Sequence, residues 1–221
     1  MKKKVRYELK ILVVGSPGVG KTSFVNRWIG KEFKEQYSAT IVSEFGIKLY
    51  EHKDQQYRIQ LWDIGGQDRS PSLTKIFARD SFGCIVINDI NNDKNLEESL
   101  KWKESVYNES EFIDGGKLPF LFIQNKIDLL SKEKLEEKKE ESKKIVEDNN
   151  FIGYFLTDAK NNIGINEAMN FLIENIIQRL EKSSSEGNNQ FFVNNQRNDT
   201  KQLRSFTEAE LEENKKKQKC C

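Results

Sequence analysis

The chain has 221 residues, 36% of them hydrophobic and 32% charged, which suits one domain with a polar extension. Its formal net charge of +1 excludes a strongly basic molecule, so nucleic acid is not expected as a partner. Three cysteines and one histidine exclude a disulfide framework and a zinc site and favour a reducing, intracellular compartment. The histidine, His52, lies in a polar stretch and is interpreted as a surface residue.

Strand-like and helix-like segments alternate along the first 182 residues. Short apolar or alternating runs predict strands, and apolar residues three to four positions apart predict helices. The expected strands are residues 9–14, 44–52, 56–63, 84–87, 120–123 and 151–157, and the expected helices are 21–31, 72–80, 95–109, 132–148 and 165–181. The polar residues 53–55 predict a hairpin. The order predicts an α/β fold with a six-stranded, mostly parallel sheet, one antiparallel edge strand and about five flanking helices.

The composition becomes more polar at Ser183, where the low-complexity run 183–190 begins. Such a run behaves as a flexible linker because it has too few apolar side chains to build a core. We therefore expect a compact domain at residues 1–182 and a flexible tail at residues 183–221.

A phosphate-binding loop is predicted at residues 15–22, which read Gly-Ser-Pro-Gly-Val-Gly-Lys-Thr between an apolar strand and an amphipathic helix. Glycines let backbone N–H groups point at phosphate oxygens, and the helix N-terminus adds a positive dipole. Lys21 is expected to reach the β- and γ-phosphates, and Thr22 to offer its hydroxyl to Mg²⁺. The residues expected around the phosphates are Gly15, Pro17, Gly18, Val19, Gly20, Lys21, Thr22 and Ser23.

Three further polar motifs follow expected strands. They are Asp-Ile-Gly-Gly at 63–66, Asn-Lys-Ile-Asp at 125–128 and Thr-Asp-Ala-Lys at 157–160. Ligands of open α/β sheets bind at the carboxyl ends of the strands, so these motifs are expected to meet at one site.

With the phosphate loop, these motifs resemble the Ras-like small GTPases, and within them the Rab branch, over about residues 7–181 and at the terminal cysteine pair. The resemblance implies a P-loop NTPase fold of the small-GTPase type in domain 1–182 and a hypervariable tail at 183–221. It implies GTP or GDP with Mg²⁺ as ligands, and GTP hydrolysis. It also implies a switch that regulates vesicle trafficking through nucleotide-dependent effector binding.

Guanine is the base that the residues favour. The carboxylate of Asp128 can accept two hydrogens from the guanine edge, whereas adenine offers no such pair, which disfavours a nucleoside kinase or ATPase. The resemblance implies that Asn125 ties the base loop to the phosphate loop, that Lys126 lies along the base, and that the Ala159 N–H meets O6. The residues that it places around the base are Phe33, Asn125, Lys126, Asp128, Ala159 and Lys160, although Phe33 could also be an ordinary core aromatic.

The resemblance also implies the metal ligands and the hydrolytic residue. Thr22 and Thr40 would bind Mg²⁺ through their hydroxyls, and Asp63 through a water molecule. The N–H groups of Thr40 and Gly66 would contact the γ-phosphate, and Gln67 would orient the attacking water. Loss of the γ-phosphate would remove two of these contacts and relax both loops.

Several positions depart from the usual pattern of the family. Pro17 lacks an N–H, fixes φ and would lie near Gln67, so a slow- or non-hydrolysing interaction module is the alternative function. Asp158 replaces the usual serine, and residues 42–45 depart from the usual effector stretch. Ile64, with Trp102-Lys103, resembles the Rab subfamily linked to lysosome-related organelles.

The carboxyl end carries Cys220 and Cys221 after four lysines within residues 215–219. The resemblance implies that both cysteines are geranylgeranylated. A CaaX signal is excluded because Gln218 occupies its cysteine position. Two lipid chains beside basic residues can hold a protein on an anionic membrane. The implied location is the cytoplasmic face of intracellular membranes, in exchange with the cytosol, with endosomal or lysosome-related membranes favoured. The implied partners are an exchange factor, a GTPase-activating protein, effectors at the switch regions, a Rab escort protein and a GDP-dissociation inhibitor.

Overall fold

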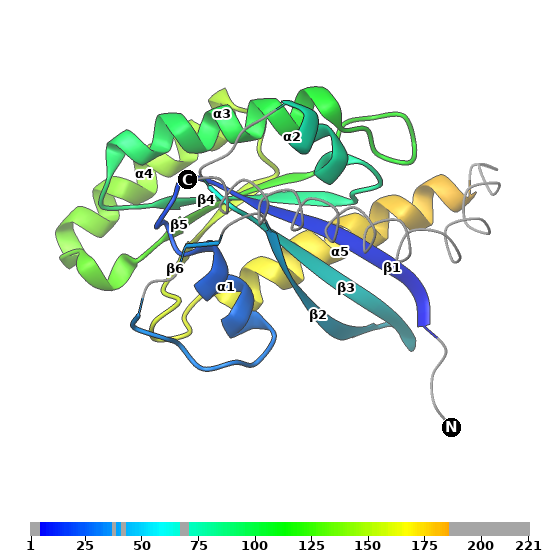
Figure 1. Ribbon diagram of the computed structural model, residues 1–221, viewed down its shortest axis with the longest axis horizontal. Helices are drawn as coiled ribbons and strands as arrows, with labels where there is room; N and C mark the ends of the chain where they lie inside the picture. Colours follow the sequence, from blue (N-terminus) through cyan, green and yellow to red (C-terminus); the bar gives the residue numbers. More distant parts are fainter. Residues whose placement is uncertain (1–4, 37–38, 41–42, 67–70, 186–221) are drawn as a thin grey trace, which may run out of the picture. The chain divides into compact units, whose positions relative to one another are not determined.

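The structure, a computed structural model, describes residues 5–36, 39–40, 43–66 and 71–185 (Figure 1). The chain divides into two units, Met1–Leu180 and Glu181–Cys221, and the first of these contains every element described below except the end of the last helix.

A six-stranded sheet forms the centre of the described chain, with the strand order β2-β3-β1-β4-β5-β6. The hairpin strands β2 and β3 are antiparallel, and the other neighbouring strands are parallel. The predicted sheet with one antiparallel edge strand is therefore confirmed. The strands are β1 (Val5–Val14), β2 (Ser43–His52), β3 (Gln55–Ile64), β4 (Gly83–Asp89), β5 (Phe120–Asn125) and β6 (Gly153–Thr157).

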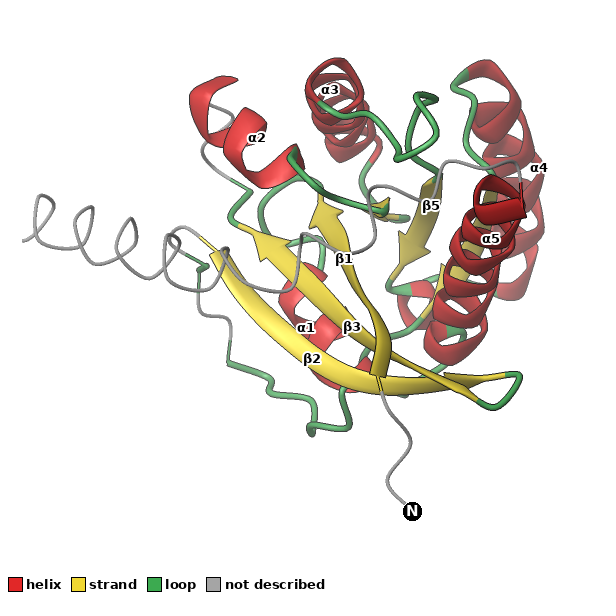
Figure 2. Cartoon of the chain, turned by 90° about the vertical axis from the view of Figure 1, so that its right-hand side faces the viewer, coloured by secondary structure: helices red, strands yellow, loops and turns green. Residues whose placement is uncertain are grey.

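Within the described residues five α-helices flank this sheet, with α1 and α5 on one face and α2, α3 and α4 on the other (Figure 1). They are α1 (Lys21–Trp28), α2 (Pro71–Ala78), α3 (Asp93–Glu109), α4 (Lys132–Asp148) and α5 (Ile165–Ser185). A 3₁₀ turn, Ile127–Leu129, follows β5. Figure 2 shows the long β2–β3 hairpin, whose strand β3 pairs with β1 from Val5 to Val13.

The helix ends differ from the expected ones for local reasons. The first helix ends at Trp28 rather than residue 31 because Gly30 has a positive φ of 90°. The third begins earlier, at Asp93, because the Asn92 side chain accepts a hydrogen bond from the Lys94 N–H at 3.2 Å and caps it. The last helix runs to Ser185 and so includes residues 183–185, which the sequence assigned to the tail.

The core follows the apolar runs of the sequence. Residues of β1, β4 and β5 are buried on both faces, as expected for central parallel strands. The strand β3 alternates, burying Tyr57, Ile59 and Leu61. His52, expected at the surface, is half-buried at the hairpin, and its Nε2 is enclosed without a hydrogen-bond partner among the described residues. The interpretation of His52 as a surface residue therefore holds only in part, because one ring nitrogen is enclosed.

Five parallel strands end at the same edge of the sheet. The loops that leave β1, β3, β4, β5 and β6 there carry the phosphate loop, Gly66, Asp89, Asn125–Asp128 and Thr157–Lys160. No helix in the described part of the chain is long and apolar enough to cross a membrane.

Candidate functional site: a nucleotide-binding edge of the sheet

The phosphate loop is a tight turn between β1 and α1 that only glycine permits at two positions. A Cβ at Gly15, where φ is 142°, would collide with the carbonyl oxygen of Ile87. A Cβ at Gly20, where φ is 98°, would collide with the Asn125 side-chain nitrogen. The phosphate loop therefore packs closely against Ile87 of β4 and Asn125 at the end of β5. Its backbone lies at the carboxyl ends of the parallel strands.

Lys21 is the first residue of α1 and is buried inside this turn, with 6% of its surface exposed. Its Nζ donates hydrogen bonds to the carbonyl oxygens of Gly15 and Ser16, each at 2.9 Å. The helix N-terminus has no side-chain cap, so its first N–H groups remain available to an anion. A buried ammonium beside free N–H groups is an arrangement that suits phosphate oxygens.

Three oxygen-bearing side chains gather beside the lysine. The Thr22 hydroxyl lies 2.9 Å from the Thr40 hydroxyl and donates to Oδ2 of Asp63. The carboxylate of Asp63 is fully buried, and its Oδ1 has no hydrogen-bond partner among the described residues. Hydroxyl and carboxylate oxygens are ligands that Mg²⁺ prefers, and an orphaned buried carboxylate oxygen needs a positive partner. The residues present therefore fit a magnesium ion.

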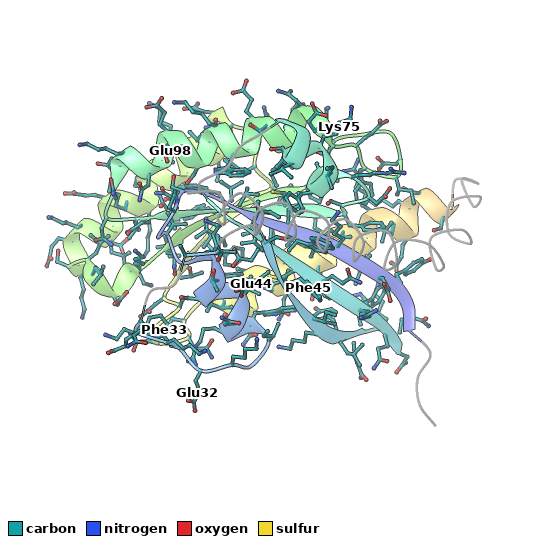
Figure 3. The ribbon with its side chains drawn as sticks, in the orientation of Figure 1. Glu32, Phe33, Glu44, Phe45, Lys75 and Glu98 are labelled. Carbon is teal, nitrogen blue, oxygen red and sulfur yellow. The ribbon has the colours of Figure 1, made fainter. Side chains whose placement is uncertain are left out.

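Burial dominates the electrostatics of this cluster. It lowers the pKa of Lys21 to about 8, against an opposing effect of Asp63. It raises the pKa of Asp63 to about 6, against the Thr22 hydrogen bond and the Lys21 charge, while Glu44 adds a further raising effect. Glu44 lies opposite Asp63 in the β2–β3 register, at the start of β2 (Figure 3). Both shifts indicate charges held away from water, which anionic phosphate and a cation would stabilise.

The loop after β3 lies directly on the phosphate loop. A Cβ at Gly66 would come within 2.6 Å of the Pro17 nitrogen and 2.8 Å of the Ser16 carbonyl carbon. The buried Ser16 hydroxyl in turn lies 3.2 Å from the Asn95 carbonyl oxygen and 3.2 Å from Oε2 of Glu98, on α3 (Figure 3). The turn that carries Pro17 therefore lies between Gly66 and α3, with Ser16 buried and Pro17 itself exposed.

Asn125 joins the base side of the site to the phosphate side. Its Nδ2 donates to the Val19 carbonyl oxygen at 2.9 Å. Its Oδ1 accepts from the Thr157 hydroxyl at 3.0 Å and from the Ala159 N–H at 3.3 Å. One buried amide thus connects the loops after β1, β5 and β6, which are far apart in sequence.

Lys126 follows in a left-handed conformation, with φ of 67°, and its ammonium forms an ion pair with Asp89 at 2.8 Å. The Asn91 side chain donates to the Lys126 carbonyl oxygen at 3.0 Å and to Asp89. Two residues on, the carboxylate of Asp128 is exposed in the 3₁₀ turn. The Lys126 side chain is therefore held by Asp89, whereas the Asp128 carboxylate is exposed to solvent, where a nucleotide base can reach it.

Comparison with known proteins finds one matching family model and several related proteins. The Ras family model matches residues 10–178. The Ras-related protein Rab-32 of Sus scrofa is 34% identical over 180 residues, covering 81% of this chain and 79% of that protein. The human Ras-related protein Rab-7L1 is 34% identical over 76% of this chain and 82% of its own length. Rab-32A of Dictyostelium discoideum is also 34% identical, over 78% and 79% respectively.

The chain belongs to the Rab branch of the Ras family of small GTPases. It is therefore a GTPase that binds GTP and GDP with Mg²⁺ and acts as a switch in membrane trafficking. The sequence predictions of family, fold, activity and ligands are confirmed. Family membership also supports exchange factors, GTPase-activating proteins and effectors as general partners.

The structure of this Rab GTPase brings most of the predicted site residues to one edge of the sheet. Phe33 is half-buried on the loop after α1 (Figure 3), and Lys160 is exposed beside Ala159. Gln67, the predicted hydrolytic residue, lies outside the described residues, as do Cys220 and Cys221. Sequence reasoning missed Asp89 and Asn91 because no local pattern links them to Lys126, more than thirty positions away.

Proposed function

We propose that this Rab GTPase binds its nucleotide with the two sets of residues described above, one for the phosphates and one for guanine. The observation that carries the proposal is the cluster of Thr22, Thr40 and Asp63 beside buried Lys21, because it combines hard oxygen ligands with a cation. Magnesium would be held by these three residues, and when bound it would supply positive charge to the phosphate oxygens. The remaining phosphate contacts would come from Gly15, Pro17, Gly18, Val19, Gly20 and Ser23.

Each residue of the nucleotide site has a distinct role in this proposal. Lys21 neutralises phosphate charge, and the carboxylate of Asp128 accepts hydrogen bonds from guanine. Gln67 orients the water that attacks the γ-phosphate, and the N–H groups of Thr40 and Gly66 respond to whether that phosphate is present. Effectors would therefore bind the surface next to Thr40 and Gly66 in the GTP state only.

A nucleotide-dependent pull-down tests this function. Gln67→Leu should hold GTP and retain effectors, whereas Thr22→Asn should hold GDP weakly and retain none. Competition between GTP and ATP for the wild-type chain provides the control for base selectivity. Binding of ATP as tightly as GTP would contradict the assigned role of Asp128.

A slow-hydrolysing variant of the same function is supported by one observation, the position of the exposed Pro17 directly against Gly66. Because Gly66 packs on the Pro17 nitrogen, an entering arginine of a GTPase-activating protein would meet a fixed ring. Such an arginine contributes roughly 10³–10⁵ to the rate where it operates. Single-turnover GTP hydrolysis of the wild type and Pro17→Gly, with and without an activator, decides the matter. Equal rates would show that Pro17 has no effect on hydrolysis.

The carboxyl-terminal part completes the proposal. The domain 1–182 would be carried on a tether, residues 183–221, anchored to membranes through geranylgeranylated Cys220 and Cys221. A Rab escort protein would present the tail for prenylation, and a GDP-dissociation inhibitor would return the protein to the cytosol. We place it on the cytoplasmic face of endosomal or lysosome-related membranes. The double variant Cys220→Ser/Cys221→Ser should move wholly to the soluble fraction, and retention on membranes would count against the anchor.

A further inference from the structure

Asp158 is the departure from the family pattern that lies nearest the base-recognition residues, and its side chain has a defined task in the loop after β6. The carboxylate is buried, with 1% of the residue exposed. One oxygen accepts a hydrogen bond from the backbone N–H of Asn161 at 2.9 Å, and the other accepts a hydrogen bond from the Asn161 side-chain amide. Both bonds go to one residue three positions ahead, so the side chain closes a ring around Ala159 and Lys160.

The backbone closes the same loop a second time. Asp158 N–H donates to the Ile163 carbonyl oxygen at 3.0 Å, and the Ile163 N–H donates back at 2.9 Å. Within this closed loop Asn162 has a positive φ of 60°. Ala159 and Lys160 therefore lie on a turn whose two ends are pinned, which limits how far the Ala159 N–H can move.

Asp158 also lies between the two residues that donate to Asn125. Thr157 on one side and Ala159 on the other reach the same Asn125 oxygen, at 3.0 and 3.3 Å. The hydrogen bonds that Asn161 donates to the Asp158 carboxylate close the turn that directly follows Ala159. Among the described residues the two N–H donors of Asn161 are the hydrogen-bond partners of this buried carboxylate, and they offset its loss of hydration.

We propose that Asp158 and Asn161 form a carboxylate clasp that positions Ala159 for contact with the guanine base, which makes Asp158 a positioning residue for nucleotide retention. The inference rests on the proposed function, in which guanine O6 shares the Ala159 N–H with Asn125 Oδ1, 3.3 Å away. Hydrogen bonds to a charged acceptor are stronger than those between neutral groups. A carboxylate therefore holds this turn more firmly than the hydroxyl of a serine, which closes such turns more weakly.

The test follows release of two nucleotides from the full-length chain, with ribose-labelled GDP and 6-thio-GDP displaced by excess GTP in a stopped-flow fluorimeter. Sulfur is a weak hydrogen-bond acceptor, so 6-thio-GDP reports the contact at position 6. The wild type should release 6-thio-GDP faster than GDP. Asp158→Ala should release GDP about tenfold to a hundredfold faster, and the two rates should converge because the contact at position 6 is lost.

Two gentler variants and one control complete the design. Asp158→Asn keeps one acceptor for the Asn161 N–H and should restore much of the difference between the two nucleotides. Asn161→Ala loses one of two bonds and should release GDP about threefold faster. Asp148→Ala removes an exposed carboxylate at the end of α4 and should match the wild type. If Asp158→Ala fails to fold, these two clasp variants decide the question.

Three results would overturn the clasp. They are unchanged release in the clasp variants, equal acceleration for both nucleotides, and a wild type that does not distinguish them. Equal acceleration would mean that Asp158 only stabilises the fold. Failure of the proposed function looks different, because the wild type would then retain ADP as well as it retains GDP.

Discussion

The base side and the phosphate side of the nucleotide site differ in how their polar groups are satisfied. On the base side, Asn125, Thr157, Ala159 and Asp158 form hydrogen bonds to one another or to Asn161. On the phosphate side, the buried Asp63 Oδ1 lacks a partner among the described residues, and Lys21 bonds only to backbone carbonyls in the contacts observed. The buried polar groups of the base side thus satisfy one another within the chain, whereas a buried oxygen of the phosphate side is left for a ligand.

This difference has a physical consequence for a switch. A loop whose polar groups already satisfy one another changes little in free energy when the nucleotide changes. A cluster of buried charges gains free energy only from a ligand that supplies opposite charge, so it responds strongly to the number of phosphates and to Mg²⁺. The base side therefore suits retention of the nucleotide, and the phosphate side suits sensing of it.

Asn125→Ala should have the largest effect, because it removes the side chain that joins the hydrogen bonds of the base side. The change leaves the Val19 carbonyl, the Thr157 hydroxyl and the Ala159 N–H without their partner. At about 1 kcal/mol or more for each of the three buried groups left unsatisfied, the loss in unfolding free energy should be at least about 3 kcal/mol. Urea unfolding in excess GDP measures it. The exposed Asn170→Ala should cost less than about 0.5 kcal/mol, and a similar cost for both would contradict the network.

Removal of magnesium should come next, because it deprives the phosphate side of its cation. Chelation should speed GDP release from the wild type about tenfold to a hundredfold, which is about 1.4–2.8 kcal/mol. Thr22→Ala should release GDP fast already, with little further response to chelation, since the hydroxyl between Thr40 and Asp63 is gone. A variant that still responded as fully as the wild type would place the metal elsewhere.

The raised pKa of Asp63 predicts a smaller, pH-dependent effect in chain freed of nucleotide and metal. Burial raises this pKa from 3.8 to about 6, so the folded chain binds the proton more tightly than the unfolded chain. The resulting stability is present below pH 3.8 and is lost as the pH rises through about 6.

From pH 7 to pH 5 the wild type should gain about 1.3 kcal/mol that Asp63→Asn does not gain. Unfolding of both chains at the two pH values measures the difference. Parallel curves for the two chains would show that the carboxylate is not desolvated.

The smallest effect is expected at the ion pair of Lys126 and Asp89, which adjusts the base side without breaking it. The pair is partly exposed, with 33% and 13% of the side chains accessible, so Asp89→Asn should speed GDP release only about threefold to fivefold, or roughly 1 kcal/mol. Glu97→Gln breaks the more exposed pair with Lys101 on α3 and serves as the control. Equal rates of GDP release from both variants would show that Asp89 does not contribute to binding of the base.

Much of this site could be predicted because its motifs are local. The phosphate loop needs glycines and a lysine at fixed spacing within one turn, and Asp128 lies within the four residues that follow β5. The clasp was also within reach of local reasoning, since an aspartate whose side chain closes a turn onto a nearby backbone N–H is a known turn pattern.

Contacts between distant parts of the chain could not be predicted. The ion pair of Asp89 and Lys126 joins two loops on neighbouring parallel strands, and Ser16 meets Glu98 only because α3 passes beside the phosphate loop. Both depend on the strand order and on side-chain direction, which no sequence pattern near these residues records. His52 is a further example, because its Nε2 is enclosed although its neighbours in the sequence are polar.

By itself, the amino-acid sequence determined the family, the ligands and the order of strands and helices, because motif chemistry and hydrophobic period are properties of neighbouring residues. Tertiary structure alone decided which polar groups of the site satisfy one another and which are left for a ligand. That division depends on burial, and burial exists only once five parallel strands bring their carboxyl ends to one edge of the sheet.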